Sequence, residues 1–146
     1  MTALASASRR SILAGLIGQG VKPSLSPEMH EREAERQGIR YVYKTIDLPH
    51  GRVAEAELRR LLASAVELGF DGLNVTHPLK QLMVSLVDDV TPDVAAIGAL
   101  NTVLINNGTT VGHNTDVTGF GRAFSEGLPG AALDELVLLC FGIIFW

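Results

Sequence analysis

The sequence contains a single cysteine, Cys140, in 146 residues, so no disulfide can form within the chain. A chain of this length can bury a core without disulfides or metal ions. Because low cysteine usage is typical of reducing compartments, we expect a cytoplasmic protein of one domain, or one domain and part of a second. An isolated thiol in an apolar run is usually buried and unreactive, so Cys140 is assigned no catalytic role.

The sequence also lacks a basic block, a long apolar run and a metal-ligand pattern. With a net charge of −4 and no clustered lysine or arginine, neither nucleic acid nor an anionic membrane surface is an expected partner. No apolar run reaches the roughly 18 residues that span a bilayer. The histidines (His30, His50, His77 and His113) show no metal-ligand spacing, and the cysteine lies far from them, so no metal site is predicted.

Two arginines precede an apolar stretch near the N-terminus, in SRRSILAGLIG. This pattern resembles a twin-arginine export signal. However, the apolar stretch is short, ends before Gln19 and is followed by no small-x-small cleavage pattern. We therefore favour a disordered N-terminus over residues 1–10, followed by a buried strand over residues 12–17.

Short apolar runs alternate with segments of helical periodicity along the rest of the chain. The predicted strands cover residues 12–17, 40–48, 70–75, 101–106 and 109–113. The predicted helices cover residues 27–37, 58–68, 79–87, 91–98 and 116–126. Strands that alternate with helices indicate an α/β fold with a mainly parallel sheet. The last two strands form a hairpin, because Asn107-Gly108 favours a type I′ turn.

Helix boundaries are also predicted from local sequence. Ser26 is expected to be the N-cap of the first helix, with Pro27 at the first helical position and Gly38 as a left-handed stop. The helix that ends at Gly69 is the clearest on the chain. Its apolar residues from Leu58 to Val66 recur at helical spacing.

Polar clusters follow the predicted strands at four places: SLSP (24–27), NVTHPLK (74–80), ALNT (99–102) and GHNTD (112–116). Ligands of open α/β sheets bind beyond the carboxyl ends of the strands. Together the clusters offer hydroxyls, carboxamides, one ammonium and one carboxylate. This set suits a neutral polyol that carries a carboxylate group and is poorly suited to a polyphosphate.

Each cluster has a purely structural alternative. Ser26 could only cap a helix, and Asn74 and Thr76 could only satisfy loop backbone groups. Asp116 could only favour a helix N-terminus, and Lys80 could be solvated. A further segment, GQGVKP (18–23), places proline where a dinucleotide-binding G-x-G-x-x-G motif needs its third glycine, so it lacks that fingerprint.

Four motifs in this order resemble the shikimate/quinate 5-dehydrogenase family: GLIGQG…SLSPEMHE, GLNVTHPLKQ, IGALNTV and GHNTDVTGFGR. The resemblance runs from about Leu13 to Leu139, and its details are similar to the actinobacterial-type branch. It implies NAD(P)-dependent reversible oxidation of shikimate to 3-dehydroshikimate, in aromatic amino-acid biosynthesis. A quinate dehydrogenase of quinate catabolism is the alternative within the family.

The resemblance assigns substrate-binding roles by position. Ser24 and Ser26 match the serines that bind the substrate carboxylate. Thr76 and Asn101 match residues that hold the ring hydroxyls, and Asn74 matches a supporting residue in the same loop as Thr76. Pro23 stands where many members have histidine, and Ser26 stands where some quinate-preferring members have threonine, so both substrates remain open.

Lys80 and Asp116 match the catalytic pair beside the hydroxyl that is oxidised, and both also bind substrate in the family. Oxidising a secondary alcohol removes a hydride from carbon and a proton from oxygen. The proton needs an acceptor or relay, and the oxygen that becomes negative needs a positive donor. Lys80 can provide both, while Asp116 can orient the hydroxyl and hold the lysine.

The C-terminus departs from the family. Family members bind NADP or NAD after a strand that leads into a G-A-G-G-x-G turn, which lets a pyrophosphate approach a helix N-terminus. Here ELVLLC supplies the strand and FGIIFW stands in place of the turn. We expect a chain cut or frame-shifted near Cys140 that binds no cofactor and is inactive alone. NAD and NADP remain equally open for the full-length protein.

The predicted organisation follows from the resemblance. A disordered N-terminus (1–10) precedes a three-layer α/β sandwich that binds the substrate (11–113). A linking helix and loop (114–133) then lead to the first strand of an incomplete Rossmann domain (134–146). The alternatives to an enzyme fragment are a stand-alone shikimate- or quinate-binding module and an interaction protein whose apolar tail docks on a partner. The apolar tail also predicts homodimer formation or aggregation.

Overall fold

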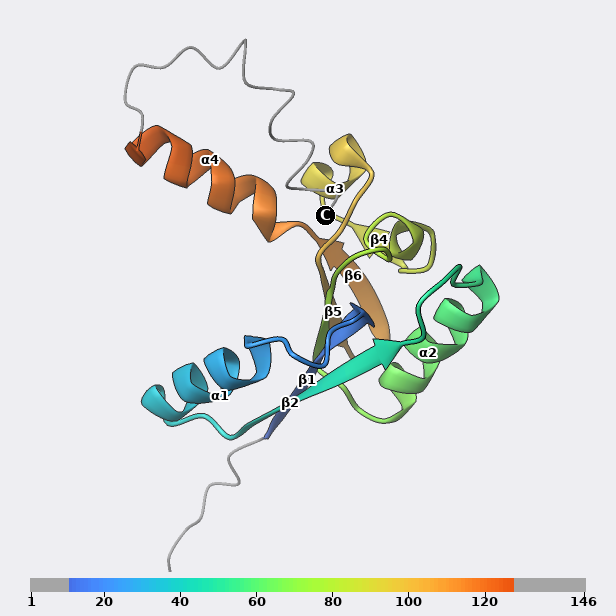
Figure 1. Cartoon of the computed structure of the whole chain (residues 1–146), viewed down its shortest axis with the longest axis horizontal. Helices are drawn as coiled ribbons and strands as arrows, with labels where there is room; N and C mark the ends of the chain where they lie inside the picture. Colours follow the sequence, from blue (N-terminus) through green and yellow to red (C-terminus); the bar gives the residue numbers. More distant parts are fainter. Residues whose placement is uncertain (1–10, 128–146) are drawn as a thin grey trace, which may run out of the picture.

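The computed structural model describes residues 11–127, which fold around one mixed sheet (Figure 1). The strands are β1 (Ile12–Gln19), β2 (Tyr41–Leu48), β3 (Gly72–Val75), β4 (Asp89–Val90), β5 (Thr102–Asn106) and β6 (Thr109–His113). The helices are α1 (Ser26–Arg36), α2 (Glu55–Glu67), α3 (Pro92–Ile97) and α4 (Thr115–Gly127), with a 3₁₀ helix, η1 (Leu82–Ser85). The predicted α/β class is confirmed.

The strand order in the sheet is β2-β1-β3-β5-β6-β4. β1 pairs in parallel with β2 and β3, and β4 pairs in parallel with β6. β5 pairs antiparallel with β3 and with β6, and the predicted hairpin between β5 and β6 is confirmed. Asn107 and Gly108 both have positive φ, 51° and 83°, as a type I′ turn requires. The sheet is therefore mainly parallel, with one inserted antiparallel strand.

One face of the sheet carries the main core. Because strand side chains alternate between faces, Ile17, Leu73 and Val103 point to the same side as one another. They pack with Leu58 and Leu62 of α2, and all five side chains are at most 5% exposed. Residues of η1 and α3 complete this core. The predicted apolar stripe of the second helix is therefore the surface that binds this helix to the sheet.

The opposite face is covered by α1, so the molecule has three layers (Figure 1). Ala14, Leu16, Val21 and Tyr43 form a second, smaller cluster of buried residues there. Ala34 is the buried residue of α1. This layer is a single helix that lies beside β1 and β2. On the neighbouring part of the same face, polar side chains of β3 and β5 contribute to the candidate site.

Two local predictions are wrong. Ser26 is the first residue of α1, and the N-cap is Leu25, whose side chain makes no capping bond; the backbone N–H of Ser26 donates to the Ser24 hydroxyl at 3.2 Å, and that hydroxyl donates to the Ser26 hydroxyl at 3.0 Å. The predicted helix over residues 79–87 is only the short η1. The carbonyl of Lys80 accepts from the backbone N–H of Leu100 at 3.0 Å, whereas the N–H of Val84, four residues after Lys80, donates to the Gln81 carbonyl at 3.2 Å, as in a 3₁₀ turn.

The short strand β4 was not predicted, whereas the predicted glycine stops are confirmed by positive φ at Gly38, Gly69 and Gly98. The predictions for residues 1–10 and 128–146, including the closing apolar run, lie outside the described residues. Within residues 11–127, no helix combines the length and the apolar character that crossing a membrane requires.

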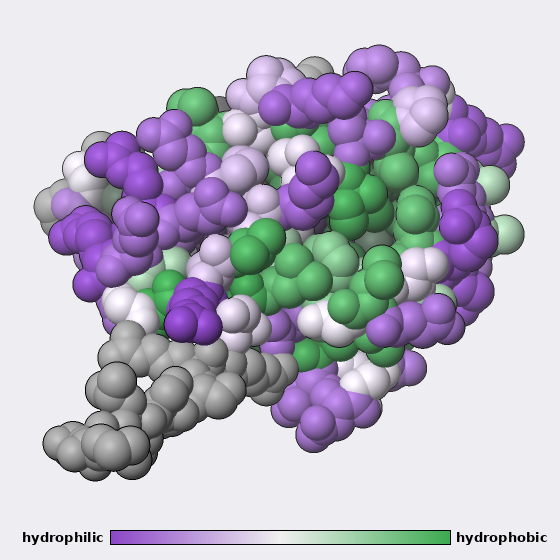
Figure 2. All heavy atoms as spheres, turned by 90° about the horizontal axis from the view of Figure 1, so that it is seen from below, coloured by the Kyte–Doolittle hydropathy of each residue, from purple (hydrophilic) through white to green (hydrophobic). Residues whose placement is uncertain are grey.

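Figure 2 shows one face of the molecule, on which apolar side chains gather in the middle and polar side chains surround them. Several large apolar side chains of the described residues are substantially exposed, among them Val42, Leu68 and Leu104. The helix α4 has no buried residue, although Val117, Phe120 and Phe124 lie on one side of it at helical spacing.

Candidate functional site

The loop after β3 is fixed by buried apolar anchors. Leu79 and Met83 are fully buried in the main core. The backbone N–H of Thr76 donates to the carbonyl of Ile17 at 3.0 Å, and that of Leu79 donates to the carbonyl of Thr76 at 2.9 Å. The His77-Pro78 peptide is cis. The loop therefore holds Thr76 and Lys80 in defined positions at the carboxyl end of the central strands.

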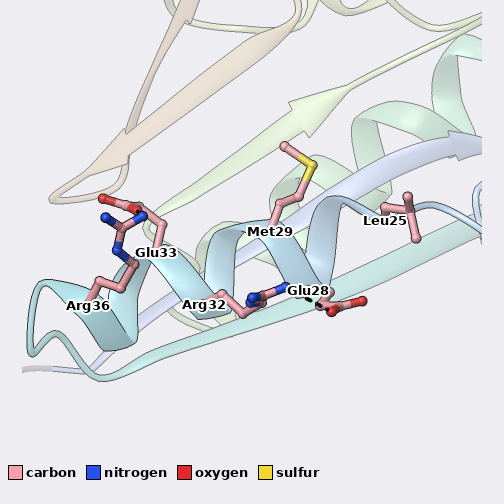
Figure 3. A pocket seen from close by; sticks show the side chains of 6 residues that line it. All are labelled: Leu25, Glu28, Met29, Arg32, Glu33 and Arg36. Atoms are coloured by element: carbon pink, nitrogen blue, oxygen red, sulfur yellow. Dashed lines mark ion pairs between the residues drawn. The ribbon is translucent and has the colours of Figure 1, made fainter.

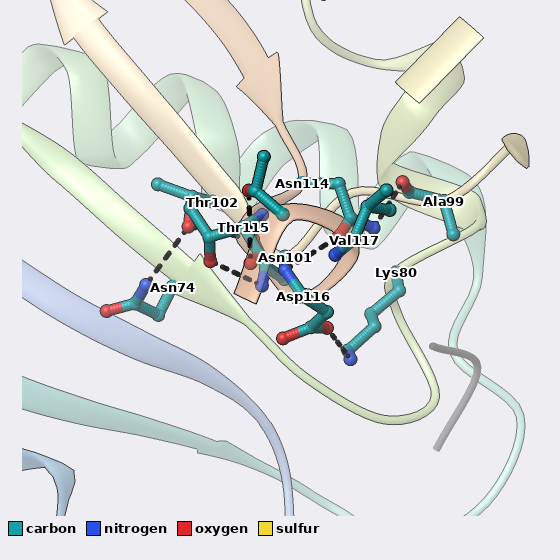
Figure 4. Close-up of polar contacts among 10 residues, drawn as sticks. Asn74, Lys80, Ala99, Asn101, Thr102, Asn114, Thr115, Asp116 and Val117 are labelled. Atoms are coloured by element: carbon teal, nitrogen blue, oxygen red, sulfur yellow. Dashed lines mark hydrogen bonds and ion pairs between the residues drawn. The ribbon is translucent and has the colours of Figure 1, made fainter. Parts of the chain in front are cut away.

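Lys80 and Asp116 form an ion pair with an Nζ to Oδ2 distance of 2.8 Å (Figure 4). The Lys80 side chain is only 9% exposed, and that of Asp116 is 32% exposed. A buried ammonium is costly without an opposite charge and hydrogen bonds. The structure thus brings together the two residues that the resemblance assigned to catalysis, 36 positions apart, with the carboxylate still open to solvent.

Asn114 positions the carboxylate of this pair. Its Oδ1 accepts from the backbone N–H groups of Asp116 and Val117, at 3.0 and 3.3 Å, and so caps the start of α4. Its Nδ2 donates to the carbonyl of Ala99 at 2.9 Å, and the side chain is buried. The sequence placed Asn114 in the GHNTD cluster but gave it no role, although an asparagine before a predicted helix is a recognisable N-cap signal.

Asn74 and Asn101 lie in one hydrogen-bonded row with Thr102 between them (Figure 4). Asn74 Nδ2 donates to Thr102 Oγ1 at 3.2 Å, and Thr102 Oγ1 donates to Asn101 Oδ1 at 3.0 Å. Asn101 also exchanges two hydrogen bonds with Thr115, the residue before Asp116. Asn101 is therefore linked to the residue beside Asp116, and Asn74 is linked to Asn101 through Thr102.

Tyr43 of β2 holds the other end of this row. Its hydroxyl donates to Asn74 Oδ1 at 2.7 Å, and its ring stacks on that of His30 with centroids 4.5 Å apart. Burial, and then the neighbouring Tyr41, raise the pKa of Tyr43 to about 12, so the hydroxyl remains a donor at neutral pH. Tyr43 was not predicted, and Thr102 was predicted only as a member of the ALNT cluster without a role, because their bonds depend on the pairing of distant strands.

Ser24, Ser26 and Thr76 line a common pocket of about 360 Å³, together with Gln19, Gly20, Val21, Pro23 and two further residues. The hydroxyl of Ser24 donates to that of Ser26 at 3.0 Å. Lys80, Asp116 and the two asparagines do not line this pocket. The two groups are joined along the chain, because Asn74 lies in β3 and Thr76 directly follows the last residue of that strand.

A different hollow runs along the outer side of α1 (Figure 3). Its lining comes from this helix and the preceding residue, with exposed Leu25 and Met29 beside the ion pair of Arg32 with Glu28. None of the predicted site residues lines it, so it is treated as helix surface. Residues 11–127 also contain no group of three or more histidine, cysteine or acidic side chains that could hold a metal ion.

The close packing of Gly18 against Thr76 yields a prediction. A Cβ added at Gly18 would lie 2.4 Å from Thr76 Cγ2 and 3.2 Å from the carbonyl oxygen of His77. We expect Gly18→Ala to displace the Thr76 loop and to destabilise the domain by about 1–3 kcal/mol. Urea denaturation measures the loss. Gly119→Ala in α4 is the control, because nothing lies within 4 Å of its added Cβ; equal stability of both variants would contradict the packing.

The described residues form an α/β domain with hydroxyl, carboxamide, ammonium and carboxylate groups near the carboxyl end of its central strands. The family model for the shikimate dehydrogenase substrate binding domain matches residues 16–103. The chain therefore belongs to the shikimate dehydrogenase family, as the sequence motifs predicted.

Similar proteins support the same family. Shikimate dehydrogenase (NADP(+)) of Streptomyces avermitilis is 53% identical over 132 residues, which are 90% of this chain and 45% of the relative's length. Quinate/shikimate dehydrogenase (NAD(+)) of Corynebacterium glutamicum strain R is 52% identical over 128 residues, 87% of this chain and 45% of the relative. This chain thus spans about half the length of these curated relatives.

A solved structure, quinate dehydrogenase from Corynebacterium glutamicum in complex with NAD, superposes with a TM-score of 0.76 at 52% identity. The superposition covers 85% of this chain and 44% of that protein. The described fold is therefore that of the first part of a dehydrogenase of this family.

Proposed function

We propose that this chain is the substrate-binding part of an NAD- or NADP-dependent shikimate dehydrogenase that also accepts quinate. The observation that carries the proposal is the ion pair of Lys80 with Asp116, 2.8 Å long and mostly shielded from water on the lysine side. A solvated lysine or a simple helix charge would not need this burial. Relatives with half of this sequence in common carry the names of shikimate and quinate/shikimate dehydrogenases.

The proposed binding mode assigns the substrate carboxylate and the ring hydroxyls to two different sets of polar side chains. The hydroxyls of Ser24 and Ser26 would hold the substrate carboxylate, since both line one pocket together with Thr76. Thr76, Asn74 and Asn101 would bind the ring hydroxyls. This division agrees with the chemistry of the two groups, because the pocket presents hydroxyl donors and the row beside it presents carboxamides.

Proton transfer is assigned to the ion pair. When the ketone is reduced, the Lys80 ammonium would donate a proton to the developing alkoxide, and in the reverse direction the lysine would take or relay the hydroxyl proton. Asp116 would orient the substrate hydroxyl and hold Nζ in place. A bound nicotinamide supplies the hydride acceptor or donor.

Residues 11–127 do not fit a dinucleotide. In the GQGVKP segment, the space beside the first glycine, Gly18, is occupied by the Thr76 side chain, which an added Cβ would meet. A pyrophosphate therefore has no room to approach the backbone at this glycine. We therefore assign the cofactor to a part of the protein outside these residues, and expect none to bind the described domain. We also expect the protein to act in the cytoplasm on a small-molecule substrate.

A chimera tests this function. Residues 1–133 would be joined to the remaining part of the Streptomyces avermitilis relative, and the reduction of NADP would be followed with shikimate and with quinate. We expect turnover by the chimera and none by the 146-residue chain alone. The intact relative is the control for the assay. A folded chimera that binds NADP but oxidises neither compound would contradict the proposal, and oxidation by the 146-residue chain alone would contradict the assignment of the cofactor.

A further inference from the structure

We infer that Tyr43 and Thr102 are positioning residues that set the orientation of both site carboxamides, Asn74 and Asn101, so that each presents an N–H to the substrate. The inference deepens the proposed function and rests on it. Neither Tyr43 nor Thr102 needs to touch the substrate. They act through an unbroken row of hydrogen bonds that begins under α1 and ends at the first turn of α4.

The direction of the row is set at its two ends. The backbone N–H of Thr115 can only donate, and it donates to Asn101 Oδ1 at 3.0 Å. At the other end, the protonated Tyr43 hydroxyl donates to Asn74 Oδ1 at 2.7 Å. Each carboxamide oxygen therefore has a fixed donor, and neither amide can turn over without losing a hydrogen bond.

Thr102 transmits the direction between the two amides. A hydroxyl has one proton, and that of Thr102 is given to Asn101 Oδ1 at 3.0 Å. Its oxygen can then only accept from Asn74, at 3.2 Å. Asn74 and Asn101 each use one of two amide hydrogens in the row, for Thr102 and Thr115 respectively. The second hydrogen of each remains for a ring hydroxyl, which a substrate with oxygen acceptors on the ring requires.

The ring of Tyr43 is held independently of its hydroxyl. It stacks on His30, and the residue is buried in the cluster beneath α1. Its backbone N–H donates to Glu31 Oε1 at 3.0 Å. Removing the hydroxyl alone should therefore leave the ring in place and release the orientation of Asn74, which makes phenylalanine an informative substitution.

The test uses the 146-residue chain with shikimate as the probe. We expect Tyr43→Phe to raise the dissociation constant for shikimate by about fivefold, the usual worth of one hydrogen bond, and Thr102→Val to raise it by about tenfold or more. Thr102→Ser keeps the hydroxyl and should restore binding to within about twofold of the parent. Tyr41→Phe removes a hydroxyl from the same aromatic stack and should leave binding unchanged.

A second measurement does not depend on binding. In Tyr43→Phe, the side-chain amide resonances of Asn74 and Asn101 should both shift in NMR spectra, whereas in Tyr41→Phe they should not. A purely structural role for Tyr43 would change the unfolding midpoint without shifting the amide resonances of Asn101. In the row, Asn74 and Thr102 separate Asn101 from Tyr43. Unchanged amide resonances, or parent-like shikimate binding by Tyr43→Phe and Thr102→Val, would overturn the inference. A parent chain that binds no shikimate would instead overturn the proposed function on which the inference rests.

Discussion

Replacing Lys80 with methionine is expected to lower kcat of the chimeric enzyme by about 10²–10⁴-fold while KM changes far less. Methionine keeps an unbranched side chain in the buried position but removes the proton donor and the positive charge. The loss should therefore fall on the transition state, where the alkoxide oxygen develops, rather than on the bound ground state. Initial rates of shikimate oxidation over a range of concentrations measure both constants.

Two further variants separate the loss of proton transfer from the loss of positive charge. Lys44→Met removes an exposed lysine of β2 and should leave both constants unchanged. Lys80→Arg keeps the positive charge but cannot release a proton, so a low kcat with retained substrate binding would assign proton transfer to the lysine. If kcat survives in Lys80→Met and only KM rises, Lys80 is a binding residue and the catalytic assignment is wrong.

Leu79→Ala is expected to lower the free energy of unfolding by about 2–5 kcal/mol. Leu79 is fully buried, and it sits directly before Lys80 in the loop that carries the site. The packing of the Leu79 side chain in the core therefore fixes the backbone position of the adjacent Lys80. Urea denaturation of the 146-residue chain, followed by circular dichroism, measures the loss.

Leu82→Ala is the matched control for this prediction. Leu82 lies three residues later on η1 and is 40% exposed, so its truncation should cost less than about 1 kcal/mol. Equal losses in the two variants would show that the loop is not anchored through Leu79. The stability of Leu79→Ala should also fall without a change in the denaturant dependence if the rest of the fold is intact.

The parts of the fold that were predictable are those determined by local sequence. The apolar spacing from Leu58 to Val66 predicted α2, and Asn107-Gly108 predicted the hairpin, because each signal involves residues close in the chain. The polar clusters were placed at strand ends by the same local patterns. Resemblance to the family then assigned their roles, including the pair of Lys80 and Asp116.

The parts that were missed depend on contacts between distant residues. Tyr43 and Asn74 are 31 positions apart, and their bond exists only because β2 and β3 flank β1. The helix after Pro78 stays short because the Lys80 carbonyl bonds to Leu100, 20 positions away along the chain. No local pattern contains these two pairings. The cap of α1 was misassigned for a local reason instead, because the Ser24 hydroxyl, two residues away, donates to the Ser26 hydroxyl and accepts from the Ser26 backbone N–H.

The most direct test of the account is a titration of the isotope-labelled 146-residue chain with shikimate, followed by NMR. The account predicts that saturable shifts gather at residues 24–26, 74–80, 101–102 and 114–116, the segments that hold the serine pocket, the carboxamides and the ion pair. The outer side of α1, around Met29 and Arg32, should not respond. Shifts confined to that helix surface, or no saturable shift at any of the four segments, would contradict the assignment of these four segments as the substrate site.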